Sequence, residues 1–123
     1  MKTILDFVSL QVRDRTESTT FYRDRLGFTV TPEENPAATV FADAGGAIFA
    51  VRDPFVPLPA DQLLGLGVSL WFTVAEKVEV LQQRLGETGV RILKPPFDTP
   101  FGRSLTVVDP DGYAITLHQS LTR

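Results

Sequence analysis

The chain has 123 residues, with 12 Lys plus Arg, 15 Asp plus Glu and one His, and its formal net charge is −3. That length suits one compact domain, and with 43% hydrophobic residues the chain can form a core. The absence of cysteine excludes a disulfide scaffold, thiolate-bound zinc, iron–sulfur clusters and thiol catalysis. A single His also excludes a site built from two or three His ligands of one chain.

The charge and the hydropathy of the chain limit the kinds of partner that it is expected to bind. The basic residues are scattered and outnumbered, so we expect no nucleic-acid partner. No apolar run approaches the ~20 residues of a membrane span, so we expect no membrane partner. Asp6 places a charge where a signal peptide needs its apolar stretch. We therefore expect a cytoplasmic protein.

The first half of the chain reads as a strand, a helix and three further strands. Residues 4–12 alternate in the strand manner. Asp14 and Glu17 are typical of a helix start, and Gly27 is typical of a helix end. The three following strands are predicted over 28–33, 39–43 and 47–53.

The second half repeats this order after a Pro-rich linker. A strand is predicted over 67–74 and a helix over 76–88, where Val78, Leu81 and Leu85 recur at helical spacing. Three strands follow, over 90–94, 103–108 and 113–119. The prolines at 95, 96 and 100 predict a stiff loop between the first two of these strands.

The two halves form an internal repeat of pattern. A shift of 62 residues lays 9–12 on 71–74 and Gly27 on Gly89, and a shift of 66 lays the Gly45-Gly46 turn on Asp111-Gly112. Each half is thus a βαβββ module. We assign module one to 1–54, a linker to 55–66 and module two to 67–123, together making a single domain over 1–123.

Two local motifs sharpen this pattern. Residues 21–28 read FYRDRLGF, and Asp109-Pro110-Asp111-Gly112 is followed by YAITL. Paired βαβββ modules with these motifs resemble the vicinal oxygen chelate superfamily, which includes glyoxalase I, extradiol dioxygenases and bleomycin-resistance proteins. The resemblance implies an α+β fold of two modules with cupped, mostly antiparallel sheets. Structural roles are also expected: Phe21, Tyr22 and Leu26 anchor the helix, and Asp109 and Asp111 are turn residues.

The metalloenzymes of that superfamily hold a divalent metal with His, Glu or Gln on the cupped strands. The resemblance maps those four positions onto Phe7, Ala50, Ser69 and Thr116. Phe and Ala have no ligand atom, and neutral hydroxyls are poor sole ligands for a transition metal. One further imidazole, His118, does not make a metal centre. We therefore expect neither a metal nor another cofactor, as in the metal-free bleomycin-resistance branch.

Strand alternation instead predicts a site for an organic ligand. Trp71 is a candidate for stacking on a planar ligand, the alternative being a core or dimer-interface aromatic. Arg52 and Arg103 are candidates for pairing with an anionic ligand, although surface ion pairs are the commoner role. Aromatic rings near the linker and the Pro-rich loop would cover either the ligand or the edge of the core. The candidate ligand-binding residues are Phe7, Ser9, Ala50, Arg52, Phe55, Ser69, Trp71, Phe97, Phe101, Arg103, Thr116 and His118.

Three functions are compatible with these residues. The first is a non-catalytic protein that sequesters an aromatic or peptide-like small molecule, and for it no catalytic residue is assigned. The second is a metal-independent lyase or isomerase with His118 as general acid or base, and Ser69, Thr116 or Arg52 polarising the substrate. A regulatory or scaffold subunit is the third. The resemblance also implies a homodimer, because the family's cups often form across a two-fold axis.

Overall fold

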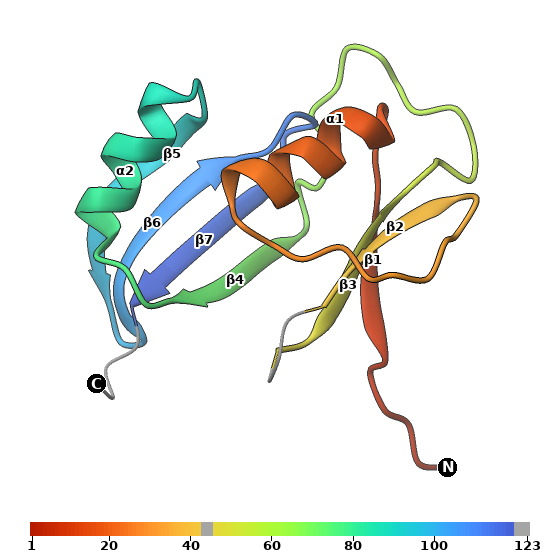
Figure 1. Ribbon diagram of the computed structural model, residues 1–123, viewed down its shortest axis with the longest axis horizontal. Coiled ribbons are helices and arrows are strands. Elements are labelled where there is room, and N and C mark those ends of the chain that lie inside the picture. Colours follow the sequence, from red (N-terminus) through yellow and green to blue (C-terminus); the bar gives the residue numbers. More distant parts are fainter. Residues whose placement is uncertain (43–45, 120–123) are drawn as a thin grey trace. The chain divides into compact units, whose positions relative to one another are not determined.

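The computed structural model describes residues 1–42 and 46–119 (Figure 1). The chain divides into two compact units, Met1–Ala60 and Asp61–Arg123, and each contains one of the two sheets. This confirms the α+β fold expected for paired modules. None of the helices in the described ranges is long and apolar enough to cross a membrane.

The first unit contains a three-stranded mixed sheet. Its strands are β1 (Phe7–Gln11), β2 (Ala38–Phe41) and β3 (Ile48–Arg52), in the order β1-β3-β2. β1 runs parallel to β3, and β2 runs antiparallel to it. The central strand β3 is therefore paired on both edges.

The helix of the first unit changes its winding halfway. α1 (Arg15–Thr20) continues directly into a π-helical segment, η1 (Phe21–Arg25). The Asp14 carboxylate caps the start by accepting the backbone N–H of Glu17 at 3.1 Å. Gly27, with φ +82°, supplies the left-handed conformation just after the helical segment.

An aromatic cluster joins this helix to its sheet. Tyr22 and Phe41 are completely buried, and Phe21 and Phe49 nearly so. The Tyr22 ring lies 5.7 Å from that of Phe41 and 5.4 Å from that of Phe49, with Phe28 closing the group. Burial of the two helix aromatics agrees with their expected role as anchors.

The prediction of a strand over residues 28–33 is wrong. This segment forms only one isolated bridge, between Val30 and Phe41, at the outer edge of β2. In this bridge the Thr31 N–H donates to the Val40 carbonyl at 2.9 Å and the Ala42 N–H donates to the Thr29 carbonyl at 3.2 Å, and no further pairing of this segment is seen in the described residues. Residues 43–45, which include the end of the strand predicted over 39–43 and the first glycine of the predicted turn, lie outside the described residues.

The second unit contains a four-stranded sheet in the order β4-β7-β6-β5. The strands are β4 (Ser69–Val74), β5 (Arg91–Thr99), β6 (Gly102–Val108) and β7 (Ala114–Gln119). β4 is parallel to β7, and the other neighbours are antiparallel. α2 (Val78–Glu87) packs against one face of this sheet (Figure 1). Its buried positions are the three predicted ones, Val78, Leu81 and Leu85.

The stiff loop predicted after residue 94 is in fact strand. β5 continues through Pro95 and Pro96 to Thr99, with shifts in register on both sides of Lys94. β5 is the outermost strand of its sheet, and there one edge needs no hydrogen-bond donors. The irregular register also accommodates the missing N–H groups.

Strand register confirms the internal repeat. Phe7 pairs with Ile48 in the first sheet, and Ser69 pairs with Ala114 in the second. The shift of 62 carries Phe7 onto Ser69, and the shift of 66 carries Ile48 onto Ala114. Both pairs are parallel, so the first and last strands of the two sheets are paired in the same way.

The turn between β6 and β7 uses its acidic residue structurally. The buried Asp109 carboxylate accepts the backbone N–H groups of Asp111 and Tyr113, each at 2.9 Å. Gly112 takes a φ of +103° in the same turn. Asp109 therefore serves as a turn residue, as the sequence indicated.

Candidate functional site

Each sheet has one face toward its own helix and one face away from it. In the first unit, α1 packs on β2 and β3, and the Thr19 hydroxyl bonds that of Thr39 at 3.0 Å. Along β1, Leu10 is buried whereas Phe7 is 51% exposed and Ser9 is exposed. The period-two alternation thus puts the predicted residues of β1 on the open face.

Five of the predicted residues lie on or beside the open face of the first sheet: Phe7, Ser9 and Ala50 on β1 and β3, and Arg52 with Phe55 at the end of β3. Ala50 of β3 is buried and pairs with Ser9 of the neighbouring strand β1, which also carries the exposed Phe7. The Ala50 side chain has no polar atom. At the end of β3, the Arg52 guanidinium lies 4.0 Å from the centroid of the Phe55 ring. The Arg52 Nε also donates to the carbonyl of Asp53 at 3.0 Å.

The open face of the second sheet carries the larger set of chemical groups, and we call it the Trp71 face. Strand register places its side chains in two rows that cross all four strands from β4 to β5. The first row consists of Trp71, Thr116, Thr106 and Lys94, and the second of Thr73, His118, Ser104 and Phe97.

Trp71 is exposed yet held in place. Its side chain is 44% exposed, and its Nε1–H donates to the Ser69 hydroxyl at 2.8 Å. The rings of Phe101 and His118 each lie 5.8 Å from the indole, Phe101 edge-on. Because the hydrogen bond and two ring contacts fix the indole, a ligand stacking on it would lose little side-chain entropy.

His118 lies beside Trp71, with ring centroids 5.8 Å apart. Its Nε2 is 3.3 Å from the Thr73 hydroxyl. Its Nδ1 is buried and has no hydrogen-bond partner in the described part of the chain. A catalytic imidazole normally has its second nitrogen held by an acidic or carbonyl group, which fixes the tautomer.

The four positions that would hold a metal do not fit one. Thr116 is 4% exposed, and its hydroxyl is committed to Thr106 at 2.9 Å. Ser69 already accepts the Trp71 N–H, and Phe7 and Ala50 offer no ligand atom. Across residues 1–42 and 46–119, no group of three or more His, Asp or Glu side chains is arranged to hold a metal ion.

Arg103 does not join the other predicted residues. It bridges Glu79 of α2, at 3.0 Å, and Asp98 of β5, at 3.1 Å, so it lies on the helix side of the sheet. A hydrogen bond from its own backbone N–H, followed by one from Arg103, holds the pKa of Glu79 below its usual range. Of the two roles considered for Arg103, a surface ion pair and the pairing with an anionic ligand, the structure shows the ion pair.

Four residues of the two rows are not among the candidate ligand-binding residues: Thr73, which alternates with Trp71 along β4, and Ser104, Thr106 and Lys94. Ser104 and Thr106 alternate along β6, which predicts their face once that strand is known to lie beside β7. Lys94 shares the face through its pairing with Thr106, and its ammonium lies 3.8 Å from the centroid of the Phe97 ring.

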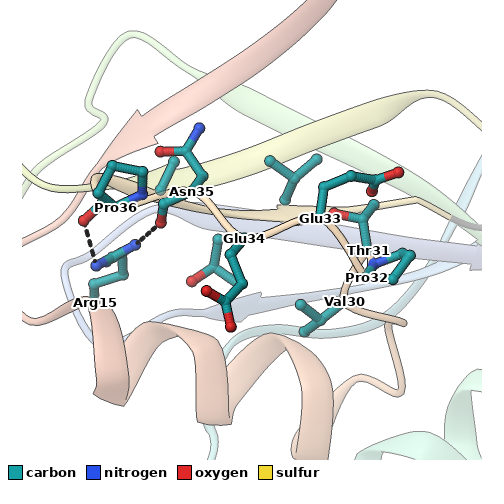
Figure 2. Close-up of a pocket in the computed structure, with 11 residues that line it drawn as sticks. Arg15, Val30, Thr31, Pro32, Glu33, Glu34, Asn35 and Pro36 are labelled. Atoms are coloured by element: carbon teal, nitrogen blue, oxygen red, sulfur yellow. Dashed lines mark hydrogen bonds between the residues drawn. The ribbon is translucent and has the colours of Figure 1, made fainter.

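A separate pocket of about 490 Å³ lies in the first unit. Figure 2 shows Arg15 reaching from α1 to the carbonyl oxygens of Asn35 and Pro36, at 3.2 and 2.9 Å. None of the sequence-predicted site residues lines this pocket. Arg15, the one cationic residue that lines this pocket, is thus bound by backbone oxygens and, at 3.3 Å, by the Asp53 carboxylate. Because this pocket contains no predicted residue and its cation is already paired, we place the candidate site on the Trp71 face.

Comparison with known proteins identifies the class. The family model of the Glyoxalase/Bleomycin resistance protein/Dioxygenase superfamily matches residues 4–117, and the chain belongs to that superfamily. It is 32% identical over 122 residues to the protein named Glutathione transferase FosA from Serratia marcescens, covering 93% of this chain and 79% of the relative.

Solved structures show the same fold. TnmS3, an antibiotic binding protein from Streptomyces sp. CB03234, has a TM-score of 0.74 and 26% identity, with 97% of each chain covered. A protein of unknown function from Agrobacterium tumefaciens str. C58 has a TM-score of 0.77 and 26% identity, covering 98% of this chain and 97% of that one. The expected superfamily is therefore confirmed.

Proposed function

We propose that this protein binds and sequesters an aromatic or peptide-like small molecule, in the manner of the bleomycin-resistance proteins and without a metal. The observation that carries the proposal is Trp71, an exposed indole fixed in orientation on the open face of the second sheet. A fixed ring offers a planar ligand apolar contact area and a stacking preference of about 0.5–1.5 kcal/mol beyond burial.

The surroundings of Trp71 suit recognition better than catalysis. Hydroxyl groups of Ser69 and Thr73 and the rings of Phe101 and His118 flank the indole. Such a mixture of apolar rings with a few polar groups is typical of ligand sites. A structural neighbour named as an antibiotic binding protein supports the same function.

An enzyme is the second candidate, supported by the relative named Glutathione transferase. In this alternative, His118 would act as acid or base in a metal-independent lyase, isomerase or transfer reaction. The unpartnered Nδ1 of His118 weighs against it, since no group in the described ranges fixes the tautomer.

Two assays separate the candidates. Trp71 supplies all indole emission of the chain, so titration with planar aromatic compounds should quench that emission saturably if the face binds them. Incubation with reactive carbonyls, with and without glutathione, should give no turnover above that of the His118→Gln variant. Turnover that the variant abolishes would replace binding with catalysis as the function.

A further inference from the structure

The charged groups of the seven strands are distributed unequally between the two faces of the sheets. Among the strands of residues 1–42 and 46–119, Asp98 is the single carboxylate, and it is ion-paired with Arg103 on the helix side of the second sheet. The Trp71 face carries Lys94 in the first row, and Arg91 shares that face further along β5 through its pairing with Val108. A chain of net charge −3 thus presents cations and no strand carboxylate on this face.

Lys94 is positioned but not neutralised. Its ammonium lies 3.8 Å from the centroid of the Phe97 ring, and no ion pair of Lys94 occurs within the described part of the chain. A cation–π contact at an exposed site contributes only about 0.5–1 kcal/mol. The contact orients the ammonium and leaves its charge available to a ligand anion.

Trp71 and Lys94 stand in one row. The register runs Trp71, Thr116, Thr106, Lys94 across four neighbouring strands. Three strand spacings of ~4.8 Å put the two outer Cα atoms ~14 Å apart. The two central side chains, Thr116 and Thr106, are small, only 4% and 8% exposed, and bonded to each other at 2.9 Å, so they rise less above the sheet than the exposed Trp71 and Lys94 side chains at the two ends of the row. An elongated molecule can therefore lie across the sheet with one end at the indole and the other at the ammonium.

We propose that the ligand of the Trp71 face is an aromatic anion, with its ring on Trp71 and a carboxylate, phenolate or similar acidic group at Lys94. This rests on the proposed binding function and specifies the chemical class of its ligand. The chain's overall negative charge would by itself favour a cationic ligand, so the proposal depends on the local charge of this face.

The test uses three probes that differ only in their head group: naphthylbutanoate, naphthylbutanamide and naphthylbutylamine. Binding to the intact chain is measured by quenching of Trp71 and by calorimetry at low and high salt. We expect the acid to bind about fivefold more tightly than the amide, the scale of one exposed ion pair, and the amine to bind most weakly. High salt should shrink the preference for the acid.

Lys94→Gln and Lys77→Gln provide matched variants, because both remove one lysine charge from the same unit and Lys77 precedes α2, away from the Trp71 face. Lys94→Gln should abolish the preference for the acid and leave the affinity for the amide unchanged. Lys77→Gln should retain the preference. An unchanged thermal midpoint in both variants shows that the fold is intact.

The other outcomes overturn the proposal at different points. Equal binding of acid and amide, or tighter binding of the amine, contradicts the anionic ligand while the binding function stands. Failure of all three probes to quench Trp71 contradicts the binding function itself. If probe affinity falls as protein concentration rises, a second copy of the chain occupies this face and the ligand assignment is wrong.

Discussion

At the scale of single residues, the buried carboxylate of Asp109 shows how an acidic side chain in a family motif can have a structural role. It accepts two backbone N–H groups in the turn between β6 and β7, each at 2.9 Å. Those donors are the kind of buried group that costs free energy when it is left without a partner. The residue is thus unavailable for catalysis.

Replacing Asp109 with Ala should lower the free energy of unfolding by about 2–3 kcal/mol, because two backbone donors lose their acceptor. Asp109→Asn keeps a side-chain oxygen and should recover most of the loss. Urea denaturation of the three proteins measures both effects. Equal stability of the Ala variant and the original protein would contradict the structural role.

At the scale of elements, the sequence predicted most helices and strands and the sheet face on which several residues of the candidate site lie. Alternation along β4 placed Ser69 and Trp71 on the open face because its helix side is apolar at every second position. It failed at the loop after Lys94, because whether a strand tolerates proline depends on its place in the sheet. It also failed over 28–33, where only Val30 bridges to β2.

The dependence on strand order also explains why the sequence did not predict three residues of the candidate site. Ser104, Thr106 and Lys94 join Trp71 only through the strand order β4-β7-β6-β5, which a local pattern does not contain. The hydrogen bond between Ser69 and Trp71, which fixes the indole, depends on side-chain rotamers. Face assignment was therefore accessible from sequence, whereas neighbours across strands were not.

The aromatic cluster of the first unit should carry much of that unit's stability. Phe41→Ala removes a completely buried ring between the helix and the sheet, and it should cost about 3–5 kcal/mol. Phe7→Ala is the matched control on the open face, and it should change stability by no more than about 0.5 kcal/mol. Denaturant titration compares the two. Similar losses would contradict the assignment of the two faces.

At the scale of the whole molecule, the positions that the family resemblance maps to metal ligands carry Phe7, Ala50, Ser69 and Thr116. We predict that the purified protein holds no stoichiometric transition metal and that EDTA leaves its thermal midpoint unchanged. Elemental analysis after dialysis measures the first and calorimetry the second. About one zinc, nickel or iron per chain would refute the prediction.

We also predict a homodimer. In the described part of the chain β1 and β4 lie at the edges of their sheets, and edge strands are common places for a second chain to pair. Light scattering at micromolar concentration should give twice the 13.6 kDa mass of one chain. A monomeric mass would contradict this prediction and leave the proposed ligand site on the second sheet intact.

The most direct test of the account is the affinity of the neutral probe naphthylbutanamide for the original protein, Trp71→Ala and Trp71→Phe, measured by calorimetry. Loss of the aromatic anchor in Trp71→Ala should weaken binding by about 1–3 kcal/mol, with the thermal midpoint unchanged. Trp71→Phe should retain part of the affinity. Unchanged affinity and stability in Trp71→Ala would contradict the binding role of Trp71, and unfolding of that variant would show that the indole is a core residue instead.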